Sequence, residues 1–108
     1  MLQEFERWAK EWQRSFRLRP GFSTSLSYGE PSPNRAILLD IISNKFIAGI
    51  TLWESNELQH EMLDVGTDEM VIWEYHQVKD FDEVLALNRA FIDRVVNLES
   101  SATGQIDS

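Results

Sequence analysis

Five short strand-like segments between residues 22 and 78 constrain the fold more than any other feature of this sequence. They span residues 22–28, 35–42, 46–54, 57–65 and 70–78, and each holds alternating or closely spaced apolar residues bounded by turn-forming ones. The longest connection between two of them has only six residues. Because parallel pairing needs a crossover of roughly a dozen residues or more, these connections predict an antiparallel meander.

An amphipathic helix is predicted on each side of these strands. The first runs from Leu2 to Phe16 and ends before Pro20-Gly21. The second begins after Asp80, whose carboxylate can cap the first turn, and its apolar pattern stops near Glu99. Both helices must cover one face of the sheet, so we expect a single α+β domain over residues 1–98. We expect residues 99–108 to form a flexible C-terminal tail.

Charge and composition suit a cytoplasmic protein whose surface would attract a basic partner. Ten Lys and Arg against 18 Asp and Glu give a net charge of −8, and the chain has no cysteine, which suits a reducing compartment. Direct nucleic-acid binding is disfavoured because most of the surface would repel phosphates. The longest apolar stretch, Ala36–Ile42, is interrupted by Asp40 and is too short to span a membrane. An alternative is that the excess acid only keeps the protein soluble.

The turns suggest a register for the last three strands. If Ser55-Asn56 is a two-residue hairpin turn and residues 66–69 form a four-residue loop, two faces follow. One face holds Trp53, Leu58, His60, Met62, Trp73 and Tyr75, and the other holds Ile50, Leu52, Gln59, Glu61, Glu74 and His76. The helices would then cover the tryptophan-rich face and leave Glu61 and Glu74 close together in solvent. A slip of one residue in either turn would exchange these faces.

Enzyme and metal chemistry have little support in the sequence. The chain has no zinc-binding HExxH motif, no nucleophile elbow of the G-x-S-x-G type and no glycine-rich phosphate loop. His60 and His76 are its only histidines, and the expected register places them on opposite faces. We therefore expect no catalytic residue, no metal site and no cofactor. A small acid-base enzyme that uses Glu74 and His76 is the weakest alternative.

Three motifs resemble a bacterial immunity-protein family called TriTu. They are the segments 50–55 (Ile-Thr-Leu-Trp-Glu-Ser), 63–67 (Leu-Asp-Val-Gly-Thr) and 71–76 (Val-Ile-Trp-Glu-Tyr-His). One departure is that this chain has Glu74-Tyr75-His76-Gln77 where the family has Glu-His-His-Glu. The resemblance implies a CdiI-type immunity protein of contact-dependent growth inhibition, which neutralises the C-terminal nuclease domain of a cognate CdiA-type toxin. It also implies that the toxin is a tRNA-cleaving RNase and that the elongation factor EF-Tu is a possible further partner through the toxin.

An acidic patch on the second half of the sheet is the predicted partner-binding site. An RNase that holds tRNA phosphates needs a basic cleft, and an acidic inhibitor can block such a cleft both sterically and electrostatically. The predicted patch consists of Glu54, Glu57, Glu61, Asp64, Asp68, Glu69 and Glu74, with Trp53, Trp73 and His76 as anchors. The alternative function is that of a generic acidic adaptor or regulator that binds a protein through an open sheet edge.

Overall fold

The computed structural model describes residues 1–16, 19–29 and 33–107, and it describes side chains as far as residue 100. Helix α1 (Leu2–Phe16) is followed by five strands, and helix α2 (Phe81–Asp107) ends the chain. The strands are β1 (Ser23–Tyr28), β2 (Ala36–Ile42), β3 (Phe46–Trp53), β4 (Glu57–Asp64) and β5 (Glu69–Gln77). They form one sheet in the order β1-β2-β3-β4-β5, and each strand pairs antiparallel with the next. The predicted α+β meander is confirmed.

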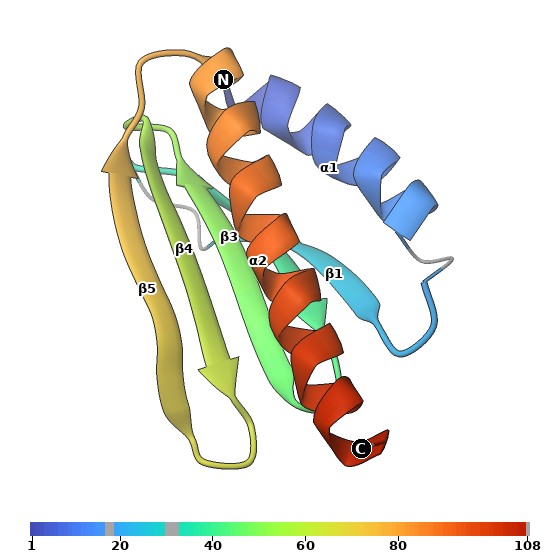
Figure 1. Cartoon of the computed structure of the whole chain (residues 1–108). Helices are drawn as coiled ribbons and strands as arrows, with labels where there is room; N and C mark the ends of the chain where they lie inside the picture. Colours follow the sequence, from blue (N-terminus) through green and yellow to red (C-terminus); the bar gives the residue numbers. More distant parts are fainter. Residues whose placement is uncertain (17–18, 30–32, 108) are drawn as a thin grey trace.

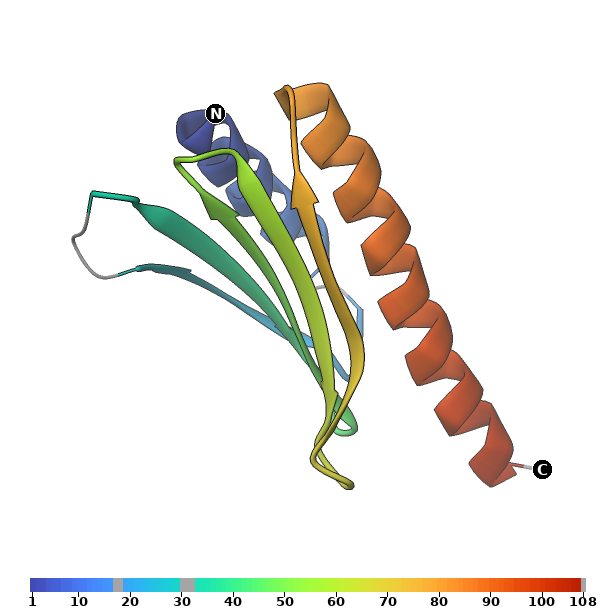
Figure 2. The same ribbon diagram turned by 90° about the vertical axis from the view of Figure 1, so that its left-hand side faces the viewer.

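Both helices lie on the same side of the sheet (Figures 1 and 2). Helix α1 contacts β1, β2 and β3, whereas α2 contacts β3 and β4. Because the strands alternate their side chains, each contributes every second residue to the core between sheet and helices. The core side chains, all at most 2% exposed, are Phe5, Ala9, Leu39, Ile41, Ala48, Ile50, Leu52, Leu58, Met62, Val84, Phe91 and Val95.

Polar contacts attach α1 to the sheet and cap the start of α2. The Tyr28 hydroxyl donates to the Glu6 carboxylate, and Gln13 Nε2 donates to Thr24 Oγ1 at 3.0 Å, so α1 is attached to β1. Helix α2 begins as predicted, because Asp80 Oδ1 accepts the backbone N–H of Glu83 at 2.9 Å. The helix continues to Asp107 and is therefore longer than its apolar pattern indicates. No helix in the described part of the chain is long and apolar enough to cross a membrane.

The expected register of β3, β4 and β5 is wrong along both hairpins, by one residue over most of their length. At the first turn, Asn56 takes a left-handed conformation (φ 67°) and its N–H donates to the Trp53 carbonyl at 3.0 Å, so Leu52 pairs with Leu58. At the second turn, Asp64 pairs with Glu69, which is a shift of two residues, and a bulge then reduces the shift to one, so Met62 pairs with Ile72. Because side chains alternate, each slip exchanges the two faces of β4 relative to its neighbours.

The corrected register places the tryptophans and the histidines on opposite sides. His60, Glu74 and His76 lie on the side covered by the helices, together with Ile50, Leu52, Leu58 and Met62. Trp53, Gln59, Glu61, Trp73 and Tyr75 lie on the other side. The helices therefore do not cover the tryptophan-rich face, and Glu61 is not a neighbour of Glu74.

Candidate protein-binding surface

No helix of the described residues covers the side of the sheet that carries Glu61 and Trp73, and we call this side the open face (Figure 2). Its central row crosses all five strands in the order Ser25, Asp40, Gly49, Glu61 and Trp73. The neighbouring row consists of Ser27, Leu38, Thr51, Gln59 and Tyr75. The open face thus changes from small hydroxyl side chains on β1 to two large aromatic rings on β5.

Large apolar side chains are exposed on the open face. Trp73 is 61% exposed and Tyr75 is 49% exposed on β5, while Ile42 and Ile47 are 37% and 40% exposed at one end of β2 and β3. Isolated exposed apolar residues are ordinary, but several on one uncovered sheet face are typical of a surface that binds a partner. Trp and Tyr are also the residue types that contribute most to protein–protein affinity.

Two carboxylates converge at the centre of this face, above Gly49. A Cβ atom at Gly49 would lie 3.3 Å from Asp40 Oδ1 and 3.4 Å from Glu61 Oε1. The glycine therefore leaves a space that the two acidic side chains approach from the adjacent strands. Gln59 Nε2 donates to the other Glu61 oxygen at 3.2 Å and helps to hold that side chain in place. Neither carboxylate forms an ion pair within the described residues.

The Asp40 side chain is partly buried, and burial disfavours its charged form. Burial among the side chains of β2 and its neighbours raises the pKa of the Asp40 carboxyl. A carboxylate in this position lacks full hydration and has no cation beside it in the described structure. A Lys or Arg brought by a partner would supply the missing charge.

The ten residues predicted to bind a partner fall into three groups. Trp53, Glu57, Glu61 and Trp73 lie on the open face. Glu54, Asp64, Asp68 and Glu69 lie in or beside the two hairpin turns, where Asp64 Oδ1 accepts the N–H groups of Gly66 and Thr67 at 2.9 and 3.1 Å. Glu74 and His76 lie on the helix side. The structure thus brings four of the ten together on the open face, places four near the turns, and separates two.

Asp40, Gly49 and Tyr75 complete the open face and were not among the predicted residues. A usable signal for Asp40 was present, since it is the one charged residue within the apolar strand Ala36–Ile42. A charge in such a strand faces either a buried partner or an uncovered side. The importance of Gly49 depends on the pairing of three strands, which the sequence alone does not give.

A separate polar cluster lies between the sheet and α2. One ligand atom each from His60, Glu74 and His76 lies within 4.8 Å of the others, although the expected register had separated the two histidines. That reason for excluding a metal site is therefore wrong. The His60 ring stacks on Phe91 with a centroid separation of 4.4 Å, and the two histidine rings are 5.6 Å apart.

Two of these three side chains already have hydrogen-bond partners. Glu74 accepts a hydrogen bond from Arg94 at 2.8 Å, and His60 Nε2 lies 2.8 Å from Asn88 Oδ1. Burial lowers the pKa of His60, so the ring is neutral near pH 7. A metal ion would have to share the Glu74 carboxylate with Arg94 and would face the charge of that guanidinium. The cluster fits a polar contact between β4, β5 and α2 better than it fits a metal site.

Comparison with known proteins adds a family to this geometry. The family model described as immunity protein TriTu matches residues 3–94, which include α1, the whole sheet and the first half of α2. No curated protein sequence matches the chain.

Proposed function

The chain belongs to the TriTu family of immunity proteins, and from this premise we propose that it binds and neutralises a cognate toxin through the open face of its sheet. Immunity proteins of this family have a toxin as their partner. The observation that carries the choice of surface is the open face itself, where the exposed rings of β5 lie beside Glu61, and where Glu61 and Asp40 form no ion pair within the described residues.

The proposed toxin is the C-terminal nuclease domain of a CdiA-type protein of contact-dependent growth inhibition, and the chain would be its CdiI. A tRNA-cleaving RNase suits the charge of the open face, because its cleft must attract phosphates and therefore carries Lys and Arg. An acidic inhibitor competes for that cleft and also attracts the toxin over a distance. In this proposal the chain acts in the cytoplasm, where tRNA is found, and it has no catalytic activity of its own.

The aromatic and the acidic residues have different roles on the proposed surface. Trp73 and Tyr75 provide apolar contact area, while Asp40 and Glu61 would receive a Lys or Arg of the toxin above Gly49. Trp53 and Glu57 extend the surface on β3 and β4. The acidic residues of the turns, Glu54, Asp64, Asp68 and Glu69, lie at its ends and would act mainly on the rate of association. The helix-side positions of Glu74 and His76 do not belong to this surface. EF-Tu would join only through the toxin.

The direct test is inhibition of the toxin domain encoded beside this gene. Purified chain is added to that domain with tRNA as substrate, and cleavage and binding are measured at low and at raised salt. We expect a stoichiometric complex that blocks cleavage and that weakens as salt rises. Binding without inhibition would support the alternative of a non-inhibitory adaptor, and the absence of binding would overturn the proposal.

Two variants assign the binding to the open face. Trp73→Ala removes the most exposed aromatic ring and should weaken binding by about 2 kcal/mol, the size of a typical hot-spot loss. Glu61→Lys places a positive charge against the basic toxin and should weaken the affinity for the toxin by at least about tenfold. Glu11→Lys makes the same charge change on α1, on the other side of the sheet, and should have little effect. Equal effects of the two Lys variants would contradict the assignment to the open face.

A further inference from the structure

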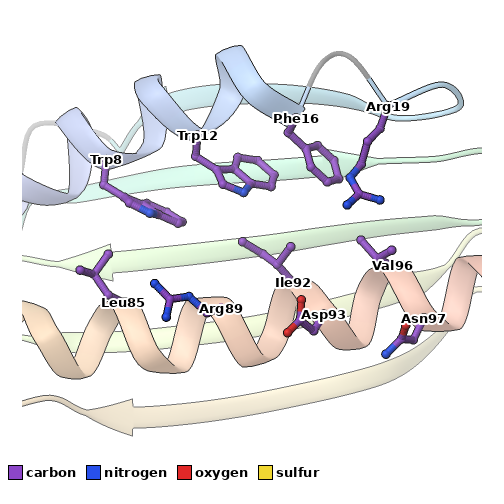
Figure 3. A pocket seen from close by; sticks show the side chains of 10 residues that line it. All are labelled: Trp8, Trp12, Phe16, Arg19, Leu85, Arg89, Ile92, Asp93, Val96 and Asn97. Carbon is purple, nitrogen blue, oxygen red and sulfur yellow. The ribbon is translucent and has the colours of Figure 1, made fainter.

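A groove with aromatic and aliphatic side chains in its lining lies on the other side of the molecule, between the two helices. It has a volume of about 450 Å³ and is lined by one side of α1, one side of α2 and Arg19 (Figure 3). Volumes of this size are typical of binding sites. The open face of the sheet contributes nothing to this groove, so a partner here would not compete with one there.

An aromatic wall forms one side of the groove. Trp8 and Trp12 are half-buried and stack with a centroid separation of 6.1 Å, and Trp12 stacks on Phe16 at 4.3 Å. Ile92 and Val96 of α2 face these rings across the gap (Figure 3). The groove therefore offers two indole rings and aliphatic side chains, a surface suited to apolar groups.

Two arginines project into the groove near its ends. Arg89 comes from α2 beside Trp8, and Arg19 comes from the loop after α1, with its guanidinium 5.6 Å from the Phe16 ring centroid (Figure 3). Neither forms an ion pair within the described residues. Asp93 is the one acidic residue of the lining, so the groove has a net positive charge.

The charges of the whole sequence are divided in the same way. Residues 1–22 contain five Lys or Arg and three Glu, whereas residues 23–108 contain five Lys or Arg and fifteen Asp or Glu. The region around α1 is thus the positive part of a strongly negative protein. A basic partner that suits the open face is unsuited to this groove, and the groove suits an acidic partner.

We propose that the groove between α1 and α2 binds an acidic amphipathic helix of a second protein. A third helix would cover the exposed sides of Trp8 and Trp12 and extend the helix layer. On α2, Arg89 and Val96 are seven residues apart, which corresponds to roughly 10 Å along a helix. Arg19 lies above Val96 in Figure 3. Carboxylates seven residues apart on the bound helix would reach the two guanidinium groups, with Leu or Phe between them against the indoles.

A pair of synthetic peptides and the four tryptophans of the chain provide the test. The probe is a capped 15-residue helical peptide with Glu at two positions seven apart and Leu on the same side between them, and its control has Gln in place of both Glu. Binding is followed by NMR of the ¹⁵N-labelled full chain through its indole N–H signals. Trp8 and Trp12 line the groove, whereas Trp53 and Trp73 lie on the open face. We expect the Glu peptide to shift the first two signals and leave the other two unchanged.

Substitutions at exposed positions of the groove give effects of opposite sign. Arg89→Gln should weaken binding of the Glu peptide about two- to fivefold, and Asp93→Asn should strengthen it by a similar factor, because each changes one charge beside the ligand. Arg7→Gln, which removes the same charge from α1 outside the groove, should change it little. No shift with the Glu peptide, equal shifts with the Gln peptide, or changes confined to Trp53 and Trp73 would each overturn the proposal. The toxin is absent from this experiment, so its result is independent of the proposed function.

Discussion

His60 Nε2 lies 2.8 Å from Asn88 Oδ1, and this hydrogen bond connects the middle of β4 to α2 inside the core. His60 is 1% exposed and Asn88 is fully buried. The Nδ2 group of Asn88 has no hydrogen-bond partner within the described residues, so its Oδ1 makes the one side-chain bond found for this residue. The contact therefore fixes how α2 sits on the sheet, and each partner depends on the other for its hydrogen bond.

The losses of stability on removal of the two partners should not be additive. Asn88→Leu leaves the buried His60 nitrogen without a partner, which we expect to lower the free energy of unfolding by about 1–3 kcal/mol. In the double variant His60→Leu/Asn88→Leu no polar group remains unpaired, and the loss should be smaller than the sum of the single losses. Urea unfolding of the four proteins measures this coupling. Additive losses would show that the bond contributes nothing, and Asn97→Leu, at an exposed position of α2, serves as the control.

The same contact predicts how stability depends on pH. Burial lowers the pKa of His60 in the folded protein, so the unfolded chain binds a proton more readily. The free energy of unfolding should therefore be constant from pH 8 to about 6.5, the ordinary value for histidine, and should fall as the pH drops below it. Urea unfolding at pH 7.5 and 5.5 measures this fall. His60→Gln should reduce it, whereas an unchanged fall in that variant would assign the effect to other groups.

The elements of this fold could be predicted from the sequence because each leaves its own periodicity. The apolar stripe of α1 gave that helix, the capping residue Asp80 gave the start of α2 but not its end, and the short connections gave the meander. The pairing of the strands could not be predicted in this way. The pairing of β3 with β4 depends on the left-handed conformation of Asn56, which makes the first turn one residue longer than expected. The pairing of β4 with β5 depends on a bulge in β5, for which the sequence contains no turn-forming residue as a signal.

The register decides which site residues lie together, so the candidate site could be predicted only in part. Trp73 and Glu61 were expected on opposite sides of the sheet, and the structure places them as direct neighbours across β4 and β5. Glu74 was expected in solvent beside Glu61, and it is bonded to Arg94 on the helix side. Composition predicts that such a chain has acidic residues to offer a partner. Only the pairing of β2, β3 and β4 reveals that two of them, Asp40 and Glu61, meet above Gly49.

Zinc should neither bind to the His60–Glu74–His76 cluster nor stabilise it. The Arg94 guanidinium already binds one oxygen of Glu74 and would repel a cation there, and His60 is held by Asn88. We expect the unfolding temperature to change by less than about 1 °C on addition of Zn²⁺ or of EDTA, because a ligand stabilises a protein only when it binds the folded state. Differential scanning fluorimetry measures both. A rise of several degrees with Zn²⁺ that His76→Gln abolishes would instead establish a metal site.

Asp40 should reduce stability while it supports binding. Its folded-state pKa is raised by burial, so the stability linked to its neutral form is present at low pH and is lost as the pH rises through that pKa. At pH 7 the neutral side chain of Asp40→Asn should therefore raise the free energy of unfolding by up to about 1 kcal/mol, a value limited by solvent screening at this partly exposed site.

The same variant should weaken the toxin complex, because it removes one of the two carboxylates above Gly49. Asp93→Asn on α2, at an exposed position, should change neither quantity by more than about 0.5 kcal/mol. Urea unfolding measures the free energy of unfolding, and a titration with the toxin domain measures the affinity. A gain in stability with no loss of binding would mean that the charge of Asp40 serves some purpose other than contact with the toxin.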